Sequence, residues 1–231
     1  AKTVFKENCK QAFKKAEPGF SFNHLKDNET LRNACTEVTS EDDSDKCNLG
    51  TVWMSKCKDK EEFERACYYG TQFLICGGIY SDVPTDKIRE IGDLNNRIGL
   101  GLGGMHEWLM QRGYKYQVTE EMHRWLNIYK RTSDEAAFIT AKEFGVAVPK
   151  GIRAIAPTGT IGILAETTTG IEPLFCKAYK RRYLKGKVWK YQYVVDGAVK
   201  RLLDQGIPIE NIIDSYDIST KERIKFQADV Q

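Results

Sequence analysis

Long amphipathic stretches of helical spacing alternate along this chain with short apolar runs typical of strands. Apolar residues recur at i, i+3, i+4 and i+7 over 59–80 and again over 118–144, where Gly145 is placed to cap the helix end. The runs Ile152–Ala156 and Ile161–Leu164 are instead predicted as short buried strands. Because helices outweigh strands and the strands lie among them, the sequence predicts an α/β fold. Without an internal repeat or a flexible linker, residues 1–231 are predicted to form a single domain.

Further elements are expected around this pattern. The predicted helices lie near Asn8–Ala16 (with a turn at Pro18-Gly19), after Pro84 along the stripe Ile88, Ile91, Leu94 and Ile98, at Met105–Arg112, at about 194–205, and after a capping box at Ser219–Glu222. The glycine string from Gly99 to Gly104 follows a helical stripe, whereas a dinucleotide-binding fingerprint would follow a strand. We therefore predict a close helix-packing turn there.

The pattern of the seven cysteines argues against a small domain held together by disulfides or by zinc. Their number is odd and no C-x-x-C spacing occurs, so neither a secreted disulfide framework nor a structural zinc site is predicted. Cys67 and Cys76 fall in a helical stretch and are expected to be buried as small apolar residues. No apolar run approaches the ~20 residues of a membrane span. A cytoplasmic protein without a metal site or membrane contact is expected.

Charge is nearly balanced, with a net value of +3, but it is unevenly distributed. The acidic run at Glu41, Asp42, Asp43 and Asp45 is predicted to be solvated surface. Basic residues alternate with aromatic ones over 175–193, a pattern of period two that predicts a plain hairpin turning at Lys185-Gly186. A nucleic-acid-binding face is the alternative; we favour the hairpin and expect no direct contact with nucleic acid.

One candidate for chemistry is the segment Asn33-Ala-Cys35-Thr-Glu37. In an extended segment these three side chains would point the same way, so an amide, a thiol and a carboxylate would share one face. Such a set could bind a hydroxyl group, give up a hydrogen atom and move a proton. Cys47 lies twelve residues after Cys35 and could supply reducing equivalents by forming a disulfide. The alternative is a loop with an incidental cysteine.

A second candidate is the Gly- and Thr-rich turn Ala156–Gly162. Backbone N–H groups and threonine hydroxyls at such a turn could bind a phosphate group. An ordinary connection between two strands is the alternative.

Together these segments resemble the large, catalytic subunit of ribonucleotide reductase. The matching motifs, in the family's order, are Asn33-x-Cys35-x-Glu37, Cys47-Asn-Leu-Gly, Asn95-Asn-Arg-Ile-Gly-Leu-Gly-Leu-Gly-Gly and Ala156-Pro-Thr-Gly-Thr-Ile-Gly through Ile171-Glu-Pro173. The segment Ala178–Trp189 and the short gap between Cys35 and Cys47 are similar to the adenosylcobalamin-dependent, class II branch. The resemblance runs from about residue 30 to the end and implies part of a ten-stranded α/β barrel.

The resemblance also implies roles for these residues. Cys35 would carry the thiyl radical, Glu37 would act as general base, Asn33 would bind the sugar, and Cys47 would belong to the reducing pair. These residues lie in a thiyl-site region over 30–53, where the backbone of Asn48 and Leu49 would contact the base. The phosphates would lie in a second region, 155–173, at Pro157, Thr158, Gly159, Thr160 and Ile161. The implied cofactor is adenosylcobalamin, with an external dithiol, such as a thioredoxin-like protein, as reductant.

Parts that the family needs are expected to lie elsewhere. The first reducing cysteine stands well upstream of the catalytic loop in the family, and Cys9 is too close to serve. We therefore expect this chain to work with complementary segments or subunits, as the product of a split gene or as an excised piece. Two alternatives remain: an inactive or regulatory paralogue that binds nucleotides, and a class I subunit that receives its radical from a partner protein.

Overall fold

The computed structural model describes residues 2–20 and 30–231, and it divides the chain into two compact units, Ala1–Asp43 and Ser44–Gln231. Each unit is described by itself. Helices outweigh strands, as the sequence predicts. Within the described residues no helix is both long and apolar enough to cross a membrane.

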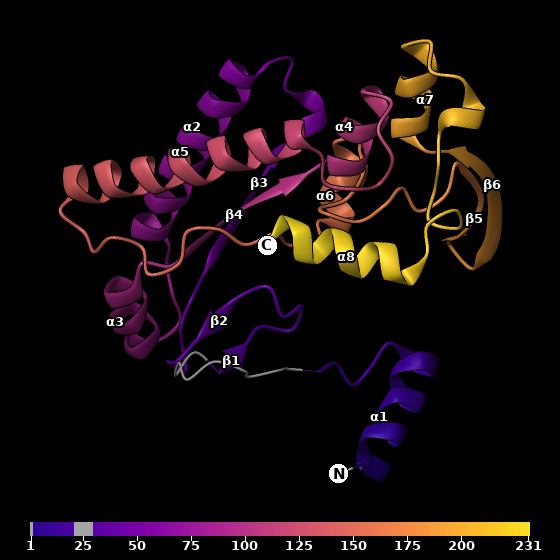
Figure 1. The fold of residues 1–231 in the computed structure, drawn as a ribbon. Coiled ribbons are helices and arrows are strands. Elements are labelled where there is room, and N and C mark those ends of the chain that lie inside the picture. Colours follow the sequence, from indigo (N-terminus) through magenta and orange to yellow (C-terminus); the bar gives the residue numbers. More distant parts are fainter. Residues whose placement is uncertain (1, 21–29) are drawn as a thin grey trace. The chain divides into compact units, whose positions relative to one another are not determined.

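In its described residues, the first unit contains one helix and one short antiparallel ladder (Figure 1). Helix α1 (Lys2–Lys15) includes most of the helix expected near Asn8–Ala16. Strands β1 (Leu31–Arg32) and β2 (Thr39–Ser40) pair so that Leu31 lies opposite Ser40. The ladder therefore brings the two ends of the segment 33–38 together.

The second unit is built on parallel strands joined by helices. Strand β3 (Asn48–Trp53) pairs in parallel with β4 (Ile98–Gly103), from Asn48 opposite Ile98 to Trp53 opposite Gly103. The connection between them carries the 3-10 turn η1 (Met54–Lys56) and the helices α2 (Lys60–Tyr80) and α3 (Asp86–Asn95). After β4, helices α4 (Met105–Gln111) and α5 (Glu120–Phe144) lead to an extended segment at 151–154.

That extended segment continues the parallel arrangement on the free side of β4. The N–H groups of Ile98 and Leu100 donate to the carbonyls of Gly151 and Ile152, both at 2.9 Å, and Arg153 forms a single bridge with Leu100. The unit thus repeats β-α-β twice, which is the repeat of an α/β barrel. These strands do not close a barrel within the described residues.

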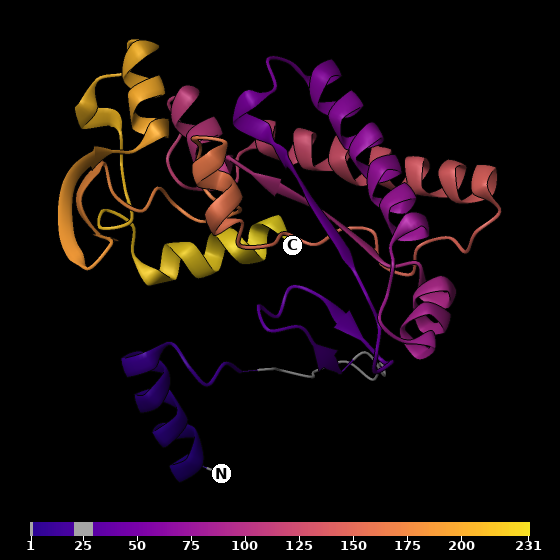
Figure 2. The same ribbon diagram turned by 180° about the vertical axis from the view of Figure 1, so that it is seen from behind.

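Helices α2 and α5 cover this sheet and form the main core (Figures 1 and 2). Phe63 on α2 and Trp125 on α5 are almost fully buried, with ring centroids 4.7 Å apart. Cys67 is buried among them as expected, whereas Cys76 is only partly buried. Both helices begin at a side-chain cap, Asp59 or Thr119, and α5 ends at Gly145 in the left-handed conformation.

The glycine string was expected to be a helix-packing turn, and this prediction is wrong. Residues 98–103 form strand β4, and α3 ends at Asn95, so Ile98 does not extend the helical stripe. Leu100 and Leu102 are buried on one face, while the glycines face tightly packed neighbours on the other. A Cβ atom at Gly101 would lie 2.7 Å from the carbonyl oxygen of Ala154.

The predicted buried strand Ile161–Leu164 is also wrong. Residues Gly159–Leu164 form the short helix α6, in which Ile161, Ile163 and Leu164 are exposed. The backbone satisfies itself locally, since the N–H of Gly162 donates to the carbonyl of Thr158 at 2.8 Å. The other predicted strand, Ile152–Ala156, pairs with β4 through Ile152, Arg153 and Ala154, but only Ala154 of this run is buried.

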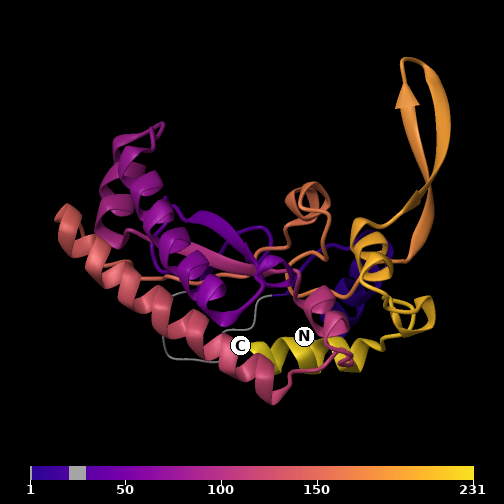
Figure 3. The ribbon, with the colours of Figure 1, turned by 90° about the horizontal axis from the view of Figure 1, so that it is seen from above.

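The C-terminal part follows the sequence pattern closely. Strands β5 (Ala178–Lys185) and β6 (Val188–Val195) form the expected hairpin, which turns through Gly186 and stands away from the helices of this unit (Figure 3). Helix α7 (Gly197–Asp204), the 3-10 turn η2 (Ile209–Asn211) and helix α8 (Thr220–Val230) follow. The predicted capping box between Ser219 and Glu222 is present.

Candidate active site

The segment Asn33–Glu37 lies in a turn between β1 and β2. Asn33 closes the turn: its N–H donates to the carbonyl of Val38 at 3.4 Å, and its Oδ1 accepts the N–H of Val38 at 3.1 Å. Thr36 adopts a positive φ of 66°. The extended conformation from which we derived a shared face is therefore wrong. The three residues instead lie in a turn that Asn33 closes.

The reactive groups of this turn differ in their exposure to solvent. Cys35 is exposed at the tip of the turn. Glu37 is partly buried, and its Oε2 atom is buried with no hydrogen-bond partner among the described residues. A carboxylate oxygen without a donor is an available proton acceptor. The turn therefore carries an exposed thiol and, two residues later, a carboxylate oxygen that no described donor satisfies.

The second predicted group lies at the start of β3, in the other unit. Cys47 and Leu49 lie over Gly99 of β4, where a Cβ atom would be 3.2 Å from Cys47 Sγ and 2.5 Å from Leu49 Cδ2. Ala154 fills the same space and stands three residues before Pro157. The Asn48 side chain donates to the carbonyl of Leu74 on α2 at 3.2 Å, so this side chain is held against the helix.

A buried ion pair, which the sequence pattern did not predict, lies just before strand β3. Asp45 was expected on a solvated surface, but it accepts a hydrogen bond from Arg97 Nε at 3.0 Å, with both side chains less than a tenth exposed. Asn95 Nδ2 also donates to Asp45 at 3.1 Å. The pair fixes the backbone two residues before Cys47. The Asn-Asn-Arg motif before β4 was the available signal.

The predicted phosphate-binding turn opens helix α6. Thr158 adopts a left-handed conformation with φ of 53°, and its side chain does not cap the helix. Its hydroxyl oxygen instead accepts the N–H of Gly170 at 2.8 Å. The first-turn N–H groups of Gly159, Thr160 and Ile161 have no acceptor within the helix, and these three residues are exposed. They are available to an anion.

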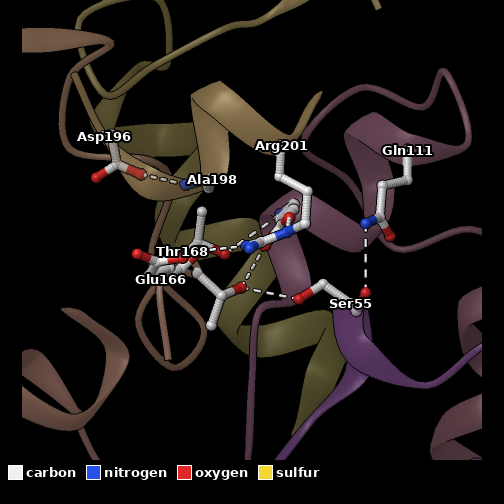
Figure 4. Close-up of polar contacts among 9 residues, drawn as sticks. Ser55, Gln111, Glu166, Thr168, Asp196, Ala198 and Arg201 are labelled. Atoms are coloured by element: carbon white, nitrogen blue, oxygen red, sulfur yellow. Dashed lines mark hydrogen bonds and ion pairs between the residues drawn. The ribbon is translucent and has the colours of Figure 1, made fainter. Parts of the chain in front are cut away.

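Behind this turn lies a buried polar network that sequence reasoning missed (Figure 4). Glu107 on α4 is fully buried and forms a bidentate ion pair with Arg201 on α7, at 2.7 Å for Nε–Oε1 and 3.0 Å for Nη2–Oε2. Its carboxylate also accepts the hydroxyl of Thr167, which lies 2.8 Å from the hydroxyl of Ser55. Nothing in the local pattern around Glu107 indicates a partner 94 positions away.

His106, the residue before Glu107, is also hydrogen-bonded to the segment that follows α6. His106 is fully buried, and its Nδ1 accepts the N–H of Leu174 at 2.8 Å. Its proton is therefore on Nε2, which has no hydrogen-bond partner among the described residues. Burial lowers the pKa of His106 to about 3. The imidazole is neutral at physiological pH.

Comparisons with known proteins agree with this architecture. Residues 1–147 and 140–229 match the family described as ribonucleotide reductase, barrel domain. A putative adenosylcobalamin-dependent ribonucleoside-triphosphate reductase of Mycobacterium phage D29 is 31% identical over 196 residues, which cover 79% of this chain and 28% of that protein. A vitamin B12-dependent ribonucleoside-diphosphate reductase of Thermoplasma acidophilum is 27% identical over 219 residues, covering 81% of this chain and 28% of that protein.

The fold is also similar to a solved one. The crystal structure of a B12-dependent (class II) ribonucleotide reductase aligns with a TM-score of 0.68 and 16% identity, covering 85% of this chain and 32% of that one. The expected fold, part of an α/β barrel, is confirmed. This chain spans under a third of the length of these relatives. By the match along nearly all of its length, the chain belongs to the ribonucleotide reductase barrel-domain family.

Proposed function

We propose that this chain is the catalytic segment of a ribonucleotide reductase, which converts ribonucleotides to 2′-deoxyribonucleotides by thiyl-radical chemistry. The observation that carries the proposal is the turn between β1 and β2, in which the exposed Cys35 thiol stands two residues from each of Asn33 and Glu37. Membership of the family supports it. The segment acts together with complementary parts of the enzyme, in the cytoplasm, where its thiols stay reduced.

In this proposal each residue of the turn has one task. The Cys35 thiyl takes the hydrogen atom from C3′ of the ribose, and the Glu37 carboxylate takes the proton of the 3′-hydroxyl. The 2′-hydroxyl then takes up a proton from the reducing thiol pair and leaves as water. Because Asn33 Oδ1 already accepts the N–H of Val38, its amide NH₂ group is the part that binds the sugar.

The reducing electrons come from two thiols. Cys47 and a partner cysteine on a complementary part of the enzyme lose two electrons and two protons as they close a disulfide, and the substrate radical is reduced. The Cys35 thiol then returns its hydrogen atom to C3′ and becomes the thiyl again, while Glu37 returns its proton to the 3′-oxygen. An external dithiol, such as a thioredoxin-like protein, restores the pair by thiol–disulfide exchange.

The cofactor proposed is adenosylcobalamin, for which the relatives are named. When bound, it supplies the radical that starts each turnover. The residue of this chain that fits such a group is Cys35, because its thiol is exposed at the tip of a turn and can be reached by an external radical.

Substrate binding is proposed at the turn that opens α6. The free N–H groups of Gly159, Thr160 and Ile161 hold the phosphates, aided by the hydroxyl of Thr160, while Pro157 and Thr158 shape the turn. The nucleobase lies against the backbone of Asn48 and Leu49. A ribonucleoside di- or triphosphate is the substrate class.

The test is a reductase assay on the native protein that contains this chain. Ribonucleoside di- and triphosphates are incubated with a dithiol, with and without adenosylcobalamin, and deoxyribonucleotides are quantified. Product only in the presence of the cofactor supports the proposal. Product that needs a second, radical-generating protein instead indicates a class I subunit, and nucleotide binding without reduction indicates an inactive or regulatory paralogue.

A further inference from the structure

The buried Glu107–Arg201 ion pair is hydrogen-bonded to residues 166 and 167, which follow α6. Besides binding Glu107, Arg201 donates to the backbone carbonyl of Glu166, and the Glu107 carboxylate accepts the hydroxyl of Thr167. Glu166 adopts a positive φ of 53°, a conformation that a non-glycine residue keeps only when its surroundings hold it. The ion pair thus fixes two consecutive residues just after α6.

Those two residues are in turn bonded to α6 itself. The N–H of Thr167 donates to the carbonyl of Gly162 at 3.0 Å, and the N–H of Glu166 donates to the carbonyl of Ile163 at 3.1 Å. Because α6 has only six residues, its orientation depends on such contacts at its ends. Moving residues 166–167 would move the first-turn N–H groups at the other end of the helix.

A second connection reaches the turn from the same place. The N–H of Glu107 donates to Thr168 Oγ1 at 3.2 Å, and the N–H of Gly104 donates to the carbonyl of Thr168 at 2.8 Å. Two residues later, the N–H of Gly170 donates to the hydroxyl of Thr158 at the start of α6. The start of α4 therefore fixes the segment 166–170, and this segment holds both ends of α6.

We propose that Glu107, through Arg201, is a positioning residue that sets the phosphate-binding turn Pro157–Ile161. Glu107 is fully buried and acts only through its neighbours, so it is not itself a catalytic residue. This inference rests on the proposed function for the identity of the ligand. Replacing only Glu107 leaves the charge of Arg201 without its partner, which by itself destabilises the fold, so a variant that keeps the charge is tested beside it.

The test uses two variants and a matched control in the native protein that contains this chain. Glu107→Gln keeps the volume but removes the charge. Arg201→Lys keeps the charge, but an ammonium group cannot bind Glu107 and the Glu166 carbonyl together as the planar guanidinium does. Because Arg201 is about a quarter exposed, we expect this variant to lower the stability of the fold less than Glu107→Gln does. Glu121→Gln is the control, since Glu121 also binds an arginine, Arg112, at 3.1 Å, but it lies on α5 and its other described partner is Tyr114.

Two readouts are taken: the dissociation constant of inorganic pyrophosphate by calorimetry, and the KM and kcat of ribonucleotide reduction. We expect Glu107→Gln and Arg201→Lys to weaken pyrophosphate binding and raise KM about tenfold, with kcat changed less than about threefold, as for a loss of ground-state binding. Glu121→Gln is expected to change neither, even where it lowers the melting temperature.

The outcomes separate this inference from the proposed function. Pyrophosphate binding that is absent from the wild type, or equal in all four proteins at equal folded fraction, overturns the inference whether or not the protein is a reductase. Pyrophosphate binding that is weakened as expected, in a wild type that reduces no ribonucleotide, overturns the proposed function and leaves the positioning role of Glu107 in place.

Discussion

His106 is a base that the fold keeps neutral. It lies fully buried on α4, with its ring edge against Tyr116 at a centroid distance of 5.0 Å. Burial favours the uncharged form, so the pKa of His106 is lowered from its usual 6.5 to about 3. Protonation would also remove the acceptor for the N–H of Leu174. The side chain thus ties the segment after α6 to α4 only while it is neutral.

This gives a pH-dependent stability with a defined sign. Between pH 6.5 and about 3 the unfolded chain binds the proton and the folded chain does not. The free energy of unfolding should therefore fall as the pH drops through this window, by up to about 1.4 kcal/mol per pH unit. His106→Asn, whose Oδ1 can accept the same N–H, should lose less stability between pH 7 and pH 4.5 in urea titrations. Equal losses in both proteins would show that His106 does not stay neutral in the fold.

At this scale the sequence was informative where the residue types themselves carry the chemistry. Asn33, Cys35 and Glu37 could be singled out by type and spacing, and the structure places them in one turn. The backbone conformation was not predictable, because the positive φ at Thr36 is set by hydrogen bonds across the turn. The ion pair between Glu107 and Arg201 could not be predicted from the sequence, because it depends on tertiary packing across 94 positions.

Strand β4 shows how an element can be misassigned when two periods compete. The preceding stripe of period 3.6 predicted a helix running through Ile98, yet Ile-Gly-Leu-Gly-Leu-Gly also alternates with period two. The second pattern is the one the structure uses, since the glycines allow β3, β4 and the segment 151–154 to approach closely. Because glycine has a low strand propensity, the period-two alternation was not interpreted as a strand. The long helices α2 and α5 were predicted well because their apolar faces extend over many turns.

The close approach at Gly101 leads to a prediction about stability. Gly101→Ala would place a Cβ atom 2.7 Å from the backbone carbonyl oxygen of Ala154, and neither backbone can move without disturbing the sheet. We expect the variant to lose about 1–3 kcal/mol of unfolding free energy, measured by chemical denaturation. Gly159→Ala is the control, because no atom lies within 4 Å of its Cβ position. A Gly101→Ala variant as stable as the wild type would contradict the register of this sheet.

For the whole molecule, the central feature is a sheet that stays open. Within the described residues β3 pairs only with β4, so its other edge carries unpaired backbone groups. Such edges are normally paired or covered, and the match to this chain covers under a third of each of these relatives. We infer that further strands, from outside the described residues, pair with this edge.

Hydrogen exchange can test this inference directly. The amides of alternate residues in Asn48–Trp53 point away from β4. They should exchange fast in the isolated 231-residue chain and slowly in the native protein or complex that contains it, while the remaining amides of β3 should be protected in both. Equal protection of all six amides in the two proteins would show that no further strand joins this edge.

The role proposed for Cys35, to carry the thiyl radical, can be tested by substitution. Turnover of ribonucleotides by the native protein is compared for the wild type, Cys35→Ser and Cys9→Ser, with folding monitored by circular dichroism. Cys9 is also an exposed thiol but lies outside the proposed site. We expect Cys35→Ser to abolish deoxyribonucleotide formation without changing the fold, and Cys9→Ser to retain wild-type turnover. Undiminished turnover by a folded Cys35→Ser variant would contradict the account.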